Sequence, residues 1–178
     1  VELDHSGVAH IQLPECSHTS DSVVPAELTS LVSTLQQHAT QESVRGFVIH
    51  AKGNNWLPQA SAQAWLDFCT IGDAQAIANA ALKRSQLLRS VEKLAKPAAI
   101  VIEGNCLDLC LEFALACHHR IVATLDKPTL FGLPLVKRGI PPMAGATQRL
   151  PRLCGIPSAL PVLLGNANWD TDTALKSH

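Results

Sequence analysis

Residues 102–121 read IEGNCLDLCLEFALACHHRI, and this stretch decides the fold. A short apolar strand, Ala98–Ile102, runs into Gly104, and an apolar helix is expected over Leu107–Cys117. The first turn of a helix leaves backbone N–H groups without partners, and such groups bind anions and developing oxyanions. The junction is therefore a candidate binding site, although every helix start presents the same groups.

Glu112 is the most informative residue in this stretch, because its helix is apolar on nearly every side. Burying a carboxylate is costly unless it is paired or its pKa changes. A desolvated carboxyl group is what general acid–base catalysis uses. The alternative is a structural glutamate paired with Arg120 or Arg149, and the residues alone leave both interpretations open.

The segments around the junction alternate between strand-like and helix-like patterns. Strands are expected at Gly7–Leu13, Arg45–Ala51, His119–Thr124 and Thr129–Gly132. Helices are expected at Pro25–Gln41, Ile71–Ala95, Ala144–Leu153 and Ile156–Leu164. This mixed order predicts an α/β fold with crossover connections.

The composition excludes several classes of function. The net charge is −1 and only 4% of residues are aromatic, with no Tyr, so we expect no nucleic-acid partner. No apolar run approaches the roughly 20 residues of a membrane helix, and no secretory signal pattern is present. We therefore expect a cytoplasmic protein with reduced cysteines and no membrane span.

Motifs for common cofactors are also missing from the sequence. It contains no GxGxxG, P-loop, HExxH or GxSxG pattern, so no cofactor is expected. Four residues of metal-ligating type do cluster: Cys106, Cys110, Cys117 and His118. Their spacing matches no zinc site well, and cysteines in an apolar helix are more often small hydrophobic residues, so no metal is expected.

Two segments together resemble the crotonase (enoyl-CoA hydratase/isomerase) superfamily. They are residues 102–121 and residues 130–165, LFGLPLVKRGIPPMAGATQRLPRLCGIPSALPVLLG, of which LEFALAC and GATQRLPRL are the most specific parts. A weaker likeness runs back through RGFVIHAKGNNWLPQASA, residues 45–62. Within the superfamily, the sequence is most similar to the hydratase domain of the fatty-acid oxidation complex alpha subunit.

The resemblance implies a crotonase-like spiral of ββα units over residues 1–178, read as one α/β domain that lacks the C-terminal helical part. The family's hydratase domain continues beyond this length, so we expect an N-terminal fragment of a longer chain or a shortened descendant. The resemblance also implies an acyl-CoA thioester ligand, assembly as a homotrimer or within a fatty-acid oxidation complex, and two catalytic glutamates. By motif, Ala60 and Leu109 occupy the positions of the two backbone oxyanion donors, Glu112 the first glutamate position and Leu135 the second.

The sequence departs from the family's pattern where the chemistry takes place. The family's Gly-Gly-Gly is here residues 108–110, Asp-Leu-Cys, so side chains enter a place where glycine permits close backbone approach. The family's Gly-Ala-Asp is residues 59–61, Gln-Ala-Ser, and Pro58 before it removes a backbone donor. Leu135 cannot transfer a proton.

These departures predict a degenerate enoyl-CoA hydratase/isomerase-like domain. It would bind acyl-CoA or act as an assembly module, with weak or no hydratase activity. The alternative is an active enzyme in which Glu112 serves as the single acid/base.

Overall fold

The computed structural model describes residues 1–71, 73–123, 125–165 and 167–177. Its larger sheet has five strands in the order β1-β2-β3-β4-β6. The short β1 (Glu2–Leu3) is antiparallel to β2 (Val8–Leu13), and the rest run parallel: β3 (Gly46–Lys52), β4 (Ala98–Glu103) and β6 (His119–Val122). Parallel neighbours require crossover connections, and the intervening helices supply them.

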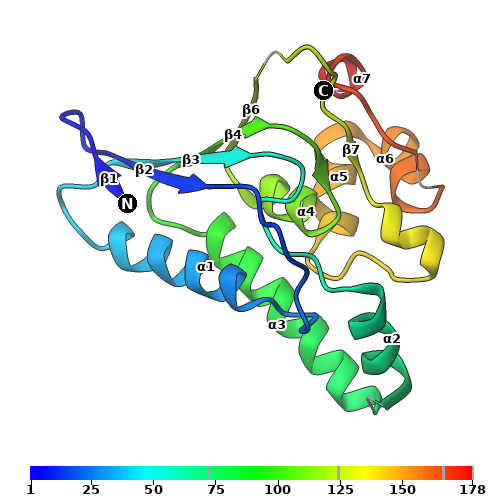
Figure 1. The fold of residues 1–178 in the computed structure, drawn as a ribbon. Helices are drawn as coiled ribbons and strands as arrows, with labels where there is room; N and C mark the ends of the chain where they lie inside the picture. Colours follow the sequence, from blue (N-terminus) through cyan, green and yellow to red (C-terminus); the bar gives the residue numbers. More distant parts are fainter. Residues whose placement is uncertain (72, 124, 166, 178) are drawn as a thin grey trace.

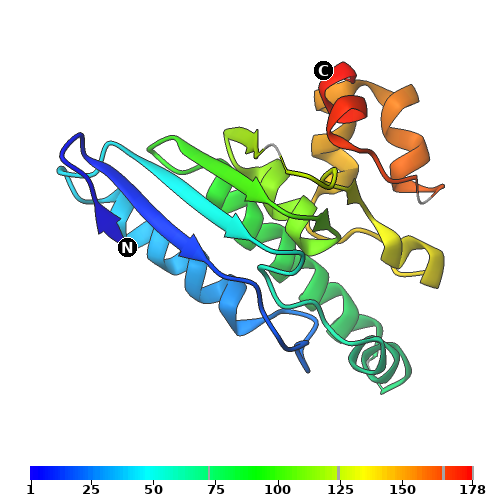
Figure 2. The same cartoon turned by 45° about the horizontal axis from the view of Figure 1, so that its top comes forward.

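Helices cover one face of this sheet. Helix α1 (Ala26–Ala39) packs on α3 (Ala74–Glu92), and Figures 1 and 2 show the two lying side by side beneath the strands. The buried residues of α1 recur at helical spacing, as the sequence predicts: Leu28, Leu31, Val32 and Leu35. Helix α2 (Ala62–Ile71) precedes α3.

The second half of the chain is built around helix α4 (Leu109–Ala116), all eight residues of which are buried. It follows β5 (Cys106–Leu107), which pairs in parallel with β7 (Phe131–Gly132) in a separate two-stranded sheet. A short 3₁₀ helix η1 (Pro134–Arg138) comes next, and then α5 (Ala146–Cys154), α6 (Ile156–Leu163) and α7 (Thr171–Lys176).

Most of the expected elements are confirmed, with shifts of a few residues at their ends. The helix expected over Ile71–Ala95 is wrong in its first turn: α2 ends at Ile71, and α3 begins after Asp73, whose side chain accepts a hydrogen bond from Ala76 N at 2.7 Å. An aspartate in this capping position starts a new helix. The end of the strand expected over His119–Thr124 falls at Thr124, which lies outside the described residues.

Helix α4 starts two residues later than expected. Cys106 and Leu107 belong to β5, because they hydrogen-bond to the strand that ends at Gly132. Elements β1, α2, η1 and α7 were not expected from the sequence at all.

None of the described helices is long and apolar enough to cross a membrane.

Candidate functional site

The start of α4 is held in an unusual backbone conformation at Asp108. Its φ is 47° and its ψ is −117°, and it alone among the described non-glycine residues has a positive φ. Such a conformation costs about 1–3 kcal/mol unless the surroundings stabilise it. Asp108 N donates to Gly132 O at 2.9 Å, and Asp108 Oδ1 accepts from Leu135 N at 3.1 Å. These contacts tie the start of α4 to β7 and η1.

The side chain of Gln59 lies across the first turn of α4. Leu109 N, the N–H that the family resemblance assigns to the oxyanion hole, donates to Gln59 Oε1 at 3.4 Å. Gln59 Nε2 in turn donates to Leu107 O at 3.5 Å. An oxyanion hole needs an N–H that is free to meet the developing charge, whereas here an amide oxygen already accepts from it.

The second assigned donor, Ala60, lies in the same loop. This loop is bridged to Ser20, because Ser20 N donates to Gln59 O at 2.8 Å and Ser61 N donates to Ser20 O at 3.1 Å. The structure therefore brings residues 59–61 against the start of α4. The contact itself is made by Gln59 rather than by Ala60.

Glu112 is 2% exposed and fully engaged. Its Oε1 accepts from Ala144 N at 2.8 Å and from Ala146 N at 3.2 Å, and its Oε2 lies 3.7 Å from Arg84 Nη2. Burial raises the pKa of Glu112, while the Arg84 guanidinium and the two backbone donors limit that rise by favouring the ionised form. The carboxylate joins α4 to α3 and to the start of α5.

The expectation that a structural Glu112 would pair with Arg120 or Arg149 is wrong. Arg120 Nη1 donates instead to Cys117 O at 2.8 Å, beyond the end of α4. Arg149 Nη2 lies 3.2 Å from Glu92 Oε2. The partner of Glu112 is Arg84, which lies on α3 and is itself buried.

Glu112, Leu135 and Leu109 line one small cavity, together with Asp108 and Arg84. The structure therefore brings three of the four residues named by the family resemblance together, whereas Ala60 is not among the lining residues. The free volume of the cavity is about 10 Å³, which is roughly the space for a single water molecule. A thioester carbonyl cannot enter this cavity unless the surrounding side chains move.

Asp108 places a second carboxyl group in this cavity. Burial raises its pKa from 3.8 to about 6; the N–H of Leu135 and the charge of Arg84 oppose this rise, and the charge of Glu112 adds to it. The folded protein therefore holds this proton more tightly than the unfolded chain. The stabilisation is complete below about pH 4 and is lost as the pH rises through about 6.

We expect the substitution Asp108→Asn to remove this pH dependence. The unfolding free energy of the wild type should fall by about 1–2 kcal/mol more than that of the variant when the pH is raised from 4 to 7. This figure includes a reduction for the partial exposure of the Asp108 side chain. Urea unfolding at the two pH values measures it. The exposed Asp126→Asn is the control, and a wild-type curve that stays parallel to that of Asp108→Asn would contradict the pKa assignment.

The cysteine cluster has the properties of core packing. Cys106, Cys110 and Cys117 are buried, and burial raises the pKa of Cys110 and of Cys117 to about 12. Metal ligation requires thiolates, which such thiols do not form readily. His118 Nδ1 accepts from Ala98 N at 3.1 Å, and in the part of the chain that the structure describes no three ligand-type side chains converge.

Comparison with solved structures defines the class of fold. The chain superposes on DspI from Pseudomonas aeruginosa (23% identity, TM-score 0.80) over 98% of its own length and 63% of that protein. It matches an enoyl-CoA hydratase from Bacillus anthracis (25% identity, TM-score 0.78) over 99% of its length and 66% of the other chain. An enoyl-CoA hydratase/isomerase family protein from Silicibacter pomeroyi gives 22% identity, TM-score 0.78 and coverage of 99% and 70%.

These neighbours confirm the predicted fold: the chain has a crotonase-like α/β fold that spans about two thirds of the length of the proteins it matches. No protein-family model matches the chain. Fold likeness at this level of identity does not transfer an activity.

Sequence reasoning missed two residues of this site, Arg84 and Gln59. Arg84 left a signal, because it stands four and seven residues before the buried Leu88 and Val91 and therefore lies on the buried stripe of α3. A charged residue in such a stripe needs a buried partner. Gln59 stands out in the sequence only as a departure from the family's glycine; its contact with Leu109 has no signal there, because it depends on which way one flexible side chain points.

Proposed function

We propose that this chain is a crotonase-fold module that retains the acyl-thioester site of its structural neighbours in a closed form, with weak or no hydratase activity. The observation that carries the proposal is the hydrogen bond from Leu109 N to Gln59 Oε1, which occupies the oxyanion donor. Leu135 offers no second proton-transfer group, and loss of one such group typically costs about 10²–10⁴ in rate. The remaining carboxylate, Glu112, is bound to three donors of the protein itself.

Acyl-CoA stays the proposed ligand, because two of the structural neighbours described above are named as enoyl-CoA hydratase or hydratase/isomerase. Entry of a thioester requires the Gln59 side chain to leave Leu109 N. We place the module in the cytoplasm as a single domain related to the hydratase domain of fatty-acid oxidation complexes. In the alternative, an active enzyme, Glu112 acts as the single acid/base once Gln59 is displaced.

The first experiment follows the absorbance of the conjugated thioester of crotonyl-CoA. We expect the wild-type protein to remove it no faster than buffer does. A faster loss that is abolished by Glu112→Gln would establish the active alternative instead.

Calorimetry of crotonyl-CoA binding then tests the closed site directly. Gln59→Ala should bind more tightly than wild type, because Leu109 N becomes free to donate to the thioester oxygen. The control is Gln63→Ala, whose side chain donates to the exposed Asp67 on α2 at 2.7 Å. Equal affinities for wild type and Gln59→Ala would contradict the closed-site proposal.

An assembly role is also supported by one surface. Ile156, Leu160 and Leu164 follow one another at four-residue spacing along α6 and its end, and are 64%, 45% and 74% exposed. An apolar stripe of this kind is typical of a surface covered by a partner. We propose that this surface is covered by a second copy of the chain in a homotrimer, or by another subunit of a fatty-acid oxidation complex. The mass of the particle by light scattering tests the homotrimer, and the mass of one chain would contradict it.

A further inference from the structure

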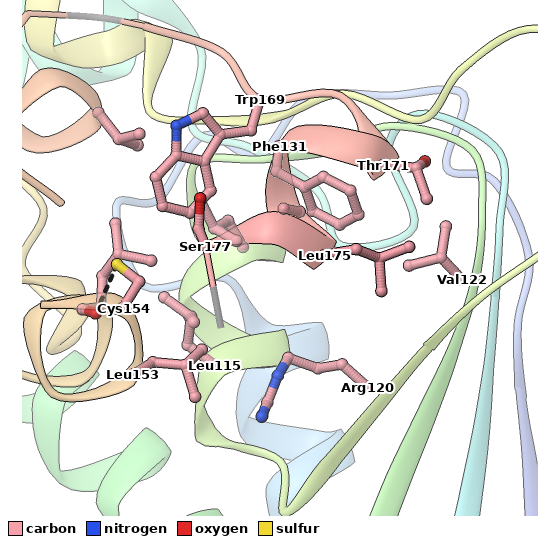
Figure 3. A pocket seen from close by; sticks show the side chains of 14 residues that line it. Leu115, Arg120, Val122, Phe131, Leu153, Cys154, Trp169, Thr171, Leu175 and Ser177 are labelled. Atoms are coloured by element: carbon pink, nitrogen blue, oxygen red, sulfur yellow. Dashed lines mark hydrogen bonds between the residues drawn. The ribbon is translucent and has the colours of Figure 1, made fainter. Parts of the chain in front are cut away.

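A second, larger cavity lies against a different side of α4. Leu111 and Leu115 face it, whereas Leu109 and Glu112 face the small filled cavity described above. Its volume is about 180 Å³, and β6, β7, α5, α6 and α7 supply the rest of its walls. Figure 3 shows Phe131, Trp169 and Leu175 around it, with Leu115 and Leu153 on the other side.

The walls of this cavity are mostly apolar, and three of the polar side chains in the lining are bonded within the protein, while Thr171 and Trp169 add a hydroxyl group and an indole N–H. Arg120 Nη1 donates to Cys117 O at 2.8 Å, Cys154 Sγ to Leu150 O at 3.1 Å, and Ser177 Oγ to Thr173 O at 2.8 Å. A ligand would therefore gain mainly from burying hydrocarbon against the leucine, valine and phenylalanine side chains. An uncharged apolar group suits such walls, because burying a charge without a partner is costly.

We propose that this cavity is a binding site for the hydrocarbon group of a small uncharged ligand. An engineered protein cavity of about 150 Å³ lined by apolar side chains stays dry and binds benzene, so this one has room for an alkyl chain of roughly six carbons or for one ring. Pockets for drug-sized ligands are usually about 300 Å³ or more, so a nucleotide-bearing thioester does not fit. The site is independent of the proposed acyl-thioester site.

Helix α7 forms the part of the wall that can open most easily. Thr171, Ala174 and Leu175 contribute to the lining, yet no residue of this six-residue helix is buried, and Leu175 is 69% exposed. The segment before it is attached by two backbone hydrogen bonds between Trp169 and Phe131, each of 2.8 Å. Segments with few buried contacts open at low free-energy cost, so we infer that ligands enter beneath α7.

Fluorescence of Trp169 provides a direct readout of binding. The other two tryptophans of the chain, Trp56 and Trp65, are buried away from this cavity. We expect hexan-1-ol to cause a saturable change with a Kd on the order of 1 mM or tighter, given the burial of about six carbons. Trp169→Phe should remove the signal, and calorimetry of that variant should still detect binding.

A variant that fills the cavity tests the location. Ala174→Phe should weaken hexan-1-ol binding at least 10-fold, while the matched control Ala78→Phe, on the exposed side of α3, should not. Leu153→Phe serves as a second filling variant, and thermal unfolding verifies that each variant folds. Binding that is unchanged in both filling variants, or no saturable change in the wild type, would overturn the proposal.

Hexanoate distinguishes an uncharged ligand from a carboxylate of the same length. We expect hexanoate to bind no more tightly than hexan-1-ol, because the Arg120 guanidinium is directed at the carbonyl groups at the end of α4. Hexanoate binding that is 10-fold tighter would overturn the assignment to an uncharged ligand.

Discussion

Replacing Glu112 with alanine is expected to lower the free energy of unfolding by about 3–5 kcal/mol, the usual cost of breaking a buried ion pair from one side. The substitution leaves the Arg84 guanidinium buried without its counter-charge. It also leaves the N–H groups of Ala144 and Ala146 without their acceptor. Each buried unsatisfied donor adds about 1–3 kcal/mol when water cannot reach it, although these costs overlap with that of the ion pair.

Urea unfolding at neutral pH measures this loss. A double variant then shows whether the loss comes from the unpaired charge of Arg84. Arg84→Met combined with Glu112→Leu should recover most of the stability, because removing both charges leaves no unpaired ion. The exposed Glu42→Ala should change stability by no more than about 0.5 kcal/mol. A loss below about 1 kcal/mol for Glu112→Ala would mean that Glu112 is not held by these contacts and is free for proton transfer.

The sequence was sufficient to predict that Glu112 is buried, but insufficient to identify its partner. The uniform apolarity of LEFALAC around it indicates burial on all sides, and the structure confirms this. The partner depends on how α3 lies against α4, and the periodicity of one helix contains no information about its neighbour's position. Arg120, which is closer to Glu112 in sequence, and Arg149 both bond elsewhere.

The break between α2 and α3 was missed for a different reason. Residues 62–71, AQAWLDFCTI, follow a polar loop, and the Ala- and Leu-rich run after Ile71 looked like one long helix. Asp73 did carry a capping signal, since it precedes Ala76 by the three residues that an N-cap bond spans. Composition outweighed this single residue, so the break was missed.

At the candidate site, three of the four residues that the family likeness singles out lie together, and Ala60 does not. Leu109, Glu112 and Leu135 line one cavity, although they lie on two elements of different kinds. Their catalytic roles stay predictions that the crotonyl-CoA experiments test. The block by Gln59 could not be predicted, because a glutamine in a loop has many rotamers and only packing selects one.

Gly104, at the junction between β4 and β5, is a residue whose substitution should be costly although it removes no charge and leaves no cavity. Its φ is +139°, and a Cβ added there would lie 2.3 Å from the backbone oxygen of Gly53. The loops after β3 and β4 meet at this point, where Gly53 N donates to Glu103 O at 2.9 Å. Because the clash is with backbone rather than with a flexible side chain, one of the two loops must move.

We expect Gly104→Ala to lower the unfolding free energy by about 3–4 kcal/mol, from backbone strain and from crowding together. Gly139→Ala is the matched control, since its φ is +76° but no atom lies within 4 Å of the added Cβ. That variant has milder backbone strain and no clash, and it should lose only about 1–2 kcal/mol. Equal losses in urea unfolding would show that close approach of the two loops adds nothing. We expect the larger loss for Gly104→Ala, because backbone strain at φ +139° and the close approach of the two loops act together at the junction that leads to β5 and to the start of α4, where Gln59 meets Leu109.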